Sequence, residues 1–340
     1  MSLIVQTTKY PIYKPMKYPW AYEFWKTHEK LHWTEEELTL ADDVHDFNRA
    51  DEEEKEFITN ILRLFTQNDV MVGAGYDVML RIFKPTEIQM MLRTFANREN
   101  THISAYALLT ETLGFDDSIY TEFIEIPLME KKTYYLEKAK VRKYEDYKKN
   151  GLSDQEVDEQ FRRAVARMLA VYAGATEGIS LMAQFAMLLY FQFQGKYKGM
   201  CQVVDWSIKD ESQHQEGNSM LFRTFIKENP DIWDDELKAD IYGAIREIVS
   251  YEEALVDYLN PPHMDKEKVK EYIRYMADNA LKLLGMKANY GIENNPLPYM
   301  DEITDGVSLV NFFENRVTDY AKGNLTGSWD ELRKELKETK

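Results

Sequence analysis

The chain has 340 residues, enough to bury a large core in one domain or two, and a formal net charge of −17. No basic stripe accompanies the acidic residues, which argues against nucleic-acid binding through phosphate neutralisation. The single cysteine, Cys201, excludes a disulfide within the chain and fits a reducing cytosol, so we expect a cytoplasmic protein in which Cys201 is a small buried hydrophobe.

Residues 1–20 are predicted to form an N-terminal arm. Their composition favours an extended segment that lies over the surface or over a partner subunit. Residues 1–9 lack the apolar core of a secretory signal. The prolines and aromatic residues of the arm are Tyr10, Pro11, Tyr13, Pro15, Tyr18, Pro19 and Trp20.

Helical periodicity dominates the chain after the arm, and runs of alternating β pattern are absent. Helix breakers interrupt the pattern at Asn150-Gly151, Asn229-Pro230 and Asn260-Pro261, and Ser153 is a helix-start signal. We therefore predict an all-α protein with one helical domain over residues 21–322. The predicted helices cover about residues 20–30, 51–81, 85–113, 117–149, 154–186, 188–194, 201–228, 232–257, 265–288 and 305–322.

The most apolar stretch, residues 168–193, is long enough to span a bilayer. However, Glu177 lies near its middle, and neither an aromatic belt nor a positive-inside pattern brackets it. We therefore predict the central helix of a large bundle, apolar all round because neighbouring helices cover it, and no membrane association.

Two short motifs place a glutamate three residues before a histidine: Glu99 with His102, and Glu211 with His214. At this spacing both side chains project from one helix face, so one helix can offer a metal a carboxylate oxygen and an imidazole nitrogen. Two such helices facing each other supply half of a binuclear metal site. The same arrangement occurs in ferritin-like di-iron and di-manganese carboxylate proteins.

A third pair, Glu29 and His32, has the same spacing in a different setting. No apolar run surrounds it, and a run of charges is typical of a solvated helix face, so we predict that His32 is not a ligand. The neighbouring charged residues are Lys26, Glu35, Glu36 and Glu37.

The predicted site needs two further carboxylates. Two divalent ions carry four positive charges, and burying the charge that two glutamates leave uncompensated would be very costly. Glu177 is the first candidate, because no other acidic residue lies between Glu159 and Asp205. The alternative is that Glu177 is a neutral carboxylic acid within a buried hydrogen-bond network.

The fourth carboxylate is expected from the helix over residues 51–81. Asp69 is preferred over Asp77, because Asp69 lies on the better apolar stripe. The stripe of Asp69 consists of Ile58, Leu62, Phe65, Val72 and Tyr76.

Tyr106 stands four residues after His102, one turn further along the same helix face. Beside a metal pair, a phenol can donate one electron. With 22 tyrosines in the chain, an ordinary core tyrosine is the alternative interpretation.

Together these residues resemble the small, radical-generating subunit of class I ribonucleotide reductase over about residues 20–322. The resemblance is carried by FTQNDV around Asp69, RENTHISAY, GATEGIS and KDESQH. It implies a ferritin-like bundle, and in that family the tyrosine at the place of Tyr106 commonly holds a stable radical. The metal-binding positions that it implies are Asp69, Glu99, His102, Glu177, Glu211 and His214.

Three further positions extend the resemblance to radical transfer. Trp33 in LHWTEEEL resembles the tryptophan that begins the long-range radical pathway. Asp210 resembles the aspartate that links this tryptophan to a metal-binding histidine, and Tyr320 in FFENRVTDY resembles a C-terminal tyrosine that passes the radical to the large subunit. The rival functions, a ferritin-like metal store and a dimetal ligand-binding oxidase, need none of the three.

The resemblance also implies partners and a cofactor. We expect a homodimer that works with a separate large subunit, which reduces ribonucleotides to deoxyribonucleotides. Oxygen ligands with two imidazoles suit manganese and iron alike, so a di-manganese, a di-iron and a mixed centre are all compatible with the sequence.

The charged tail over residues 323–340 departs from the family. The family usually ends in an acidic, apolar peptide that docks on the large subunit, whereas this chain ends Glu338-Thr339-Lys340. Trp329, Leu332 and Leu336 could still present a small apolar face to a groove, so we expect the tail to dock there.

Overall fold

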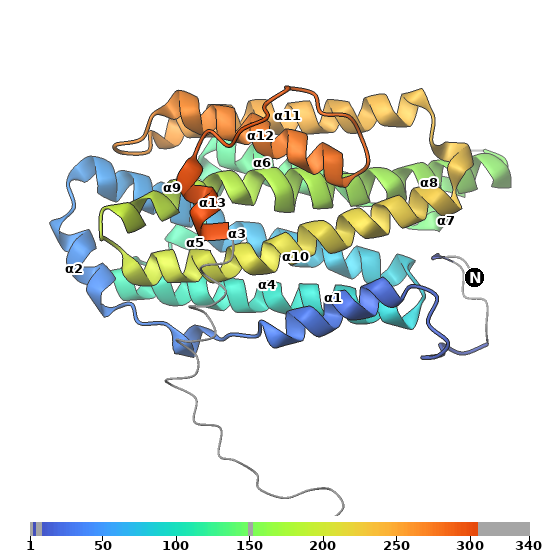
Figure 1. The fold of residues 1–340 in the computed structure, drawn as a ribbon, viewed down its shortest axis with the longest axis horizontal. Coiled ribbons are helices and arrows are strands. Elements are labelled where there is room, and N and C mark those ends of the chain that lie inside the picture. Colours follow the sequence, from blue (N-terminus) through green and yellow to red (C-terminus); the bar gives the residue numbers. More distant parts are fainter. Residues whose placement is uncertain (1–2, 5–8, 149–151, 305–340) are drawn as a thin grey trace, which may run out of the picture. The chain divides into compact units, whose positions relative to one another are not determined.

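The computed structural model describes residues 3–4, 9–148 and 152–304, and within these ranges the chain is helical without β-strands. The predicted all-α architecture is therefore confirmed. In Figure 1 the long helices run side by side along a common direction. Residues 1–297 form one compact unit, and α13 belongs to a second. The elements are α1 (Pro19–Lys30), η1 (Glu35–Glu37), α2 (Ala41–Arg49), α3 (Glu52–Ile82), α4 (Thr86–Leu113), α5 (Ile119–Glu122), η2 (Phe123–Glu125), α6 (Pro127–Ala139), α7 (Tyr144–Lys148), α8 (Asp154–Ala170), η3 (Val171–Ser180), α9 (Leu181–Phe193), α10 (Lys198–Glu228), η4 (Pro230–Ile232), α11 (Asp235–Leu259), α12 (Lys266–Leu283) and α13 (Pro298–Thr304).

Local chemistry sets several helix ends as predicted. α8 begins after a capping box, in which Ser153 Oγ accepts from the backbone N–H of Glu156 and the Glu156 carboxylate accepts from the backbone N–H of Ser153. α10 ends at Glu228, two residues before Pro230. α11 ends at Leu259, because Asn260 adopts the left-handed conformation with φ of 48°.

Other helix predictions were wrong. The stretch over residues 117–149 divides into several short helices, since Pro127 occupies the first position of α6, where its missing N–H costs nothing. α9 continues to Phe193 without the predicted break near residue 187. α2 was not predicted, and it holds a buried aspartate, Asp43, that accepts from the first backbone N–H groups of α10.

α8, η3 and α9 follow one another without a break and form the centre of the bundle. Every residue from 171 to 189 is buried, which confirms the predicted central helix. η3 is a π-helix, a form that is found mostly as short bulges at functional sites. Within the described part of the chain, no helix combines the length and apolar character needed to cross a membrane.

Gly75 of α3 allows η3 to approach closely. A Cβ atom at this position would lie 2.1 Å from the ring of Tyr172, which is part of η3. The next residue, Tyr76, donates its hydroxyl to Glu177 Oε1 at 2.9 Å. Close packing at Gly75 therefore accompanies a hydrogen bond that holds the glutamate of the π-helix.

The described part of the arm, residues 3–4 and 9–18, is tied to two glutamates. The backbone N–H groups of Lys17 and Tyr18 donate to Glu87 Oε1 at 2.8 Å, and Leu3 N donates to Glu228 Oε2 at 3.1 Å. These contacts fix the start of α1.

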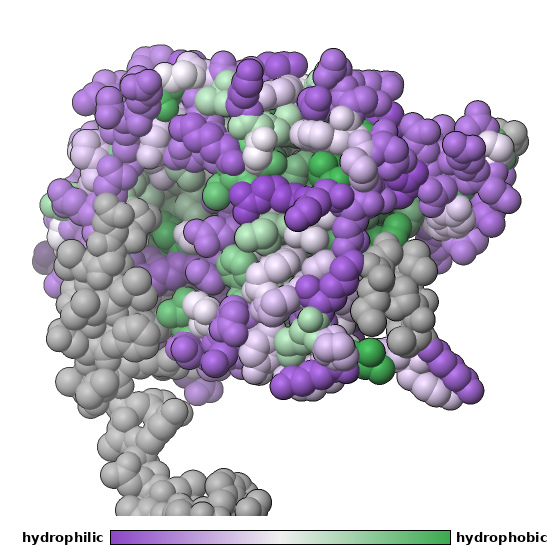
Figure 2. All heavy atoms as spheres, turned by 45° about the vertical axis from the view of Figure 1, so that its right-hand side comes forward, coloured by the Kyte–Doolittle hydropathy of each residue, from purple (hydrophilic) through white to green (hydrophobic). Residues whose placement is uncertain are grey.

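The surface in Figure 2 is mostly hydrophilic, with apolar side chains in small separate groups, in keeping with a core that holds the large apolar residues.

Candidate metal centre

The predicted metal ligands project from four elements into one buried region. The two glutamate–histidine pairs come from α4 and α10, and single carboxylates come from α3 and η3. Each of the six side chains is at most 1 % exposed to solvent, whereas Asp77, the alternative on α3, is exposed. The six residues are Asp69, Glu99, His102, Glu177, Glu211 and His214.

Four of these residues form a tight group in which each offers a ligand atom within 4.8 Å of the others: Glu99, Glu177, Glu211 and His214. His214 Nδ1 lies 2.9 Å from Glu211 Oε2 and 3.1 Å from Glu99 Oε1. Glu177 Oε1 is 4.0 Å from the same nitrogen. Three carboxylates therefore converge on the Nδ1 edge of the His214 ring.

His102 lies beside this group rather than within it. Its Nδ1 atom is 3.0 Å from Glu211 Oε1 and 3.8 Å from Glu99 Oε2. Glu99 and Glu211 therefore each contact both histidines. Carboxylates that lie between two imidazoles in this way are suited to bridging two metal ions.

Asp69 is also outside the group of four. Burial raises the pKa of its carboxyl well above the usual range, His102 lowers it, and Glu99 and Glu211 raise it further. The Asp69 carboxylate thus lies within electrostatic reach of the cluster, on the α3 side.

The residues fit a metal centre because many of their ligand atoms are buried and make no well-formed hydrogen bond among the described residues, although the Nδ1 atoms of His102 and His214 lie within 3.1 Å of three of the oxygens. These atoms are both carboxylate oxygens of Glu99 and of Glu211, one oxygen each of Asp69 and Glu177, and His214 Nδ1. Buried polar atoms in proteins nearly always have partners. Divalent cations would bind these oxygens and neutralise their charge.

The pKa shifts show the charge repulsion in the metal-free site. Burial raises the pKa of Glu177 well above its usual range, and Glu211 and Glu99 add to the rise. Burial also acts to raise the pKa of Glu211, but His214 and His102 outweigh it and lower the value. For His214, burial lowers the pKa, while Glu211 and Glu99 raise it to about 9. In the metal-free site, protons on Glu177 and His214 therefore reduce the negative charge that bound metal ions would otherwise neutralise.

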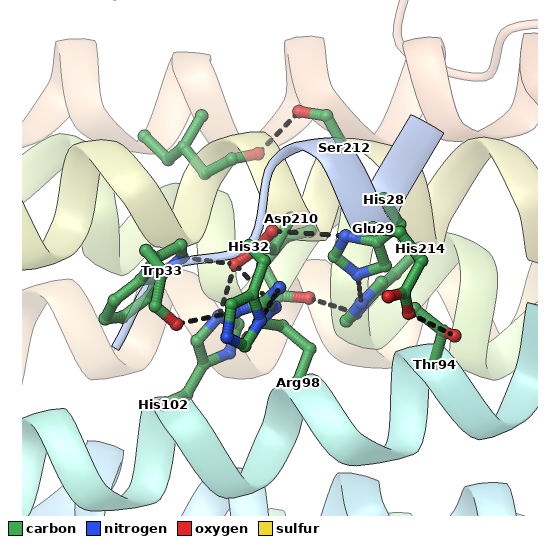
Figure 3. Close-up of polar contacts among 12 residues, drawn as sticks. His28, Glu29, His32, Trp33, Thr94, Arg98, His102, Asp210, Ser212 and His214 are labelled. Atoms are coloured by element: carbon green, nitrogen blue, oxygen red, sulfur yellow. Dashed lines mark hydrogen bonds and ion pairs between the residues drawn. The ribbon is translucent and has the colours of Figure 1, made fainter. Parts of the chain in front are cut away.

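The outward nitrogen of His102 meets the predicted radical-transfer residues. Its Nε2 atom lies 3.1 Å from Asp210 Oδ2, and Trp33 Nε1 donates to the same oxygen at 2.8 Å (Figure 3). The Trp33 and His102 rings are stacked, with centroids 5.8 Å apart. Arg98 donates to the Trp33 carbonyl at 2.9 Å, and its Nε lies 3.5 Å from Asp210 Oδ2.

His28, on α1, occupies the corresponding place beside the other metal-site histidine. Its Nε2 atom is 3.0 Å from His214 Nε2, and its Nδ1 atom is 3.3 Å from Asp210 Oδ1 (Figure 3). Burial lowers the pKa of His28 to about 3, although Asp210 raises it. His28 is therefore a neutral imidazole at physiological pH.

Tyr106 of α4 is buried against an aromatic residue of α3. Its ring stacks on Phe65 at a centroid distance of 4.7 Å, and Phe65 stacks on Phe185 at 5.4 Å. Burial and the charge of Asp69 raise the pKa of the Tyr106 phenol, while Ser207 lowers it. The phenol is therefore strongly held in its neutral form.

A buried ion pair links α6 and α11. Lys132 Nζ of α6 is 3.4 Å from Glu252 Oε1 of α11, and both side chains are at most 3 % exposed. Ser180 and Gln184 donate to the Glu252 carboxylate. Burial lowers the pKa of Lys132, while Glu252 and Asp69 raise it, so this cation is within electrostatic reach of the metal ligands.

A model of the ribonucleotide reductase small-chain family matches residues 12–296. The chain belongs to the ribonucleotide reductase small-chain family. It is 37% identical to the probable ribonucleoside-diphosphate reductase small subunit 376L of Invertebrate iridescent virus 6, covering 94% of this chain and 96% of the viral one. It is 28% identical to the ribonucleoside-diphosphate reductase subunit beta of Chlamydia pneumoniae, covering 93% and 91%. The small-chain resemblance predicted from the motifs is thus confirmed.

Solved structures show the same fold. The R2 subunit of ribonucleotide reductase from Clostridium botulinum superposes with a TM-score of 0.77 at 20% identity, covering 89% of this chain and 94% of that one. An R2-like ligand-binding oxidase gives a TM-score of 0.59 at 17% identity, covering 79% of this chain and 94% of that one. The ferritin-like fold of the small-chain family is therefore confirmed.

The sequence analysis did not identify three buried residues around the candidate metal centre: His28, Arg98 and Lys132. Only His28 left a signal, since it falls seven residues after Ala21 on the buried face of α1. His32 is exposed and contacts Arg98, away from the metal ligands. Tyr320 and the docking face of the tail lie outside the described residues.

Proposed function

We propose that the protein is the small subunit of a ribonucleoside-diphosphate reductase and supplies an oxidising equivalent to a separate large subunit. The support is the family membership together with relatives of that name, which match over more than nine-tenths of both chains. On this proposal the small subunit alone reduces no nucleotide. Its cytoplasmic location and homodimeric state are part of the same proposal.

The proposed cofactor is a binuclear metal centre. Four carboxylates neutralise two divalent ions, and the two histidines complete the ligand set. The observation that carries this assignment is the set of buried carboxylate oxygens without well-formed hydrogen bonds. When bound, the metal pair supplies the one-electron oxidising power that the amino-acid ligands lack. Di-manganese, di-iron and mixed centres all suit these ligands. The proposed ligands are Asp69, Glu99, His102, Glu177, Glu211 and His214.

The protein's own contribution to this chemistry is orientation and exclusion of water. Both metal-site histidines turn Nδ1 towards the carboxylates and Nε2 outwards. Asp210 accepts from Trp33 and contacts His102 Nε2, so three buried groups form a continuous polar connection from the indole to the site. We assign to Trp33 and Asp210 the transfer of the oxidising equivalent, and to Tyr106 its storage.

The remaining step, transfer to the large subunit, is assigned to the C-terminal region. Tyr320 would pass on the oxidising equivalent, and residues 323–340 would dock on the large subunit. The assignment of Tyr320 depends on the resemblance of FFENRVTDY to the family sequence, and that of the tail on the small apolar face of Trp329, Leu332 and Leu336.

The rival function is a dimetal oxidase or a metal store that uses the same carboxylate cage. Neither requires a hydrogen bond from a buried indole to an aspartate that contacts a metal-binding histidine. The contacts among Trp33, Asp210 and His102 therefore favour the reductase.

The test combines metal analysis with turnover. Purified protein, reconstituted with manganese or iron and mixed with the large subunit, should reduce a ribonucleoside diphosphate. Glu177→Ala should lose metal and activity, whereas His32→Ala, which changes an exposed histidine, should lose neither. Two metals per chain in Glu177→Ala would contradict the ligand assignment. A co-purifying fatty acid that is oxidised, without nucleotide turnover, would instead support the oxidase.

A further inference from the structure

We propose that His28 is a positioning residue for His214, because it receives the outward N–H of that ring and passes the hydrogen-bond connection on to Asp210. One aspartate then holds both metal-site histidines, His102 directly and His214 through His28. This inference rests on the proposed metal-binding role of the two histidines.

The contacts place His28 between its two partners. Its Nε2 atom is 3.0 Å from His214 Nε2, and the ring planes are inclined at 70° with centroids 5.1 Å apart. The opposite nitrogen is 3.3 Å from Asp210 Oδ1. His28 is fully buried, and the edge-on ring of Phe95 closes one side of it. Figure 3 shows the chain of His214, His28 and Asp210 beside that of His102 and Trp33.

The orientation of His214 decides where its proton lies. Its Nδ1 atom faces Glu211, Glu99 and Glu177, so Nδ1 is the nitrogen available to a metal. A neutral imidazole that binds a metal through one nitrogen carries its proton on the other. His214 therefore donates from Nε2.

That donor fixes the tautomer of His28. Two facing ring nitrogens can share only one proton, so His28 Nε2 must accept and its own proton must lie on Nδ1. The Nδ1 atom faces Asp210 Oδ1, and both atoms are buried without another hydrogen-bond partner among the described residues. A small turn of the ring turns this 3.3 Å contact into a hydrogen bond that satisfies both atoms.

The two oxygens of Asp210 then serve different histidines. Oδ2 meets His102 and Trp33, whereas Oδ1 meets His28. A carboxylate that accepts the outer N–H of a metal-binding imidazole orients the ring and strengthens its basicity, and loss of such a partner typically costs about 10–100-fold in metal affinity. His28 extends this effect to His214, which Asp210 does not contact directly.

The test uses the full-length chain, stripped of metal and titrated with Mn²⁺ alone. The wild type should bind two ions. In His28→Phe, which keeps a planar ring but removes both nitrogens, one ion should bind about 10–100-fold more weakly and the other should be unchanged. His28→Gln should restore most of the loss, since its amide can accept at one end and donate at the other. Asp210→Ala should weaken both ions.

Weaker Mn²⁺ binding at only one of the two sites distinguishes a positioning role of His28 from a general disruption of the fold. His45→Phe makes the same change at an exposed histidine of α2 and should leave both affinities unchanged. If His28→Phe does not fold, the smaller His28→Leu replaces it with the same expectation. Two wild-type affinities in a folded His28→Phe or His28→Leu protein would overturn the proposal. Failure of the wild type to bind metal would instead contradict the proposed function.

Discussion

The surroundings of Asp210 and of Tyr106, two predicted functional residues at the candidate metal centre, differ in polarity. Towards α1, polar side chains form a connected set in which Asp210 is shared by Trp33, His102 and His28. Towards α3, Tyr106 stacks against Phe65, which in turn stacks on Phe185. The first environment is a connected set of polar contacts, and the second holds the Tyr106 ring between aromatic neighbours. On the proposed function, the first would serve transfer of the oxidising equivalent and the second its storage.

The largest effect is expected from Trp33→Phe, which changes the surroundings of Asp210 only. The substitution removes the N–H that Asp210 accepts but keeps an aromatic ring. We expect both metals to remain bound and nearly all nucleotide reduction with the large subunit to disappear. Asp210→Asn should behave similarly, with an added change in metal affinity through His102. Metal content and turnover are measured on the same sample, and Trp233→Phe, at a tryptophan that packs on Phe222, is the control. Full turnover in Trp33→Phe would contradict the assignment of Trp33 to transfer of the oxidising equivalent.

Tyr106→Phe tests the storage role of Tyr106. It removes one hydroxyl from a stacked ring, so metal binding and stability should change little. We expect loss of nucleotide reduction and of any tyrosyl signal in electron paramagnetic resonance. Tyr251→Phe, at another buried tyrosine, should retain both. Undiminished turnover in Tyr106→Phe would show that the metals alone hold the oxidant.

Lys132→Met tests the buried cation of α6. Removing one partner of a buried ion pair leaves the Glu252 charge uncompensated, which typically costs about 3–5 kcal/mol. The free energy of unfolding of metal-free protein, measured with urea, should fall by about that amount. The double variant Lys132→Met/Glu252→Gln should recover much of the loss. An unchanged midpoint in Lys132→Met would show that the pair contributes nothing to stability.

The smallest effect is the pH dependence of metal-free stability. The pKa of His214 is about 9 in the folded chain and near 6.5 when unfolded, so the folded state binds its proton more tightly. This stabilisation is fully present below about pH 6.5 and is lost as the pH rises through about 9. The melting temperature of the metal-free protein should therefore fall by a few degrees over this range. His214→Ala should flatten the slope, and an equally steep slope in that variant would exclude His214 as its source.

The sequence revealed the parts of the site that depend on spacing along one helix. Glu99 with His102 and Glu211 with His214 follow from helical periodicity, and Glu177 stands out because its surroundings are apolar. Helical periodicity likewise predicted the long helices, whereas the segment over 117–149 is divided at Pro127 and that over 154–186 contains the π-helix. The helix predicted over 305–322 lies outside the described residues.

The residues that were missed depend on how separate helices cross. The His28 side chain contacts His214 and Asp210 of α10, so it gains its role only because α1 lies against α10. Lys132 follows Lys131 in a segment that resembles a solvated face, yet α6 buries it opposite Glu252. Neither crossing can be inferred from local patterning, since both are set by the packing of the whole bundle.

Gly75 has a consequence for the natural variation that this protein can tolerate. Adding a single methyl group there would collide with the Tyr172 ring, so alanine at position 75 requires a smaller residue at position 172, a displaced Tyr172 side chain or a displaced π-helix. A displaced π-helix would draw Glu177 away from the Tyr76 hydroxyl. Substitution at a residue with no ligand atom of its own can therefore disable the metal centre, and the two positions are expected to vary together during evolution.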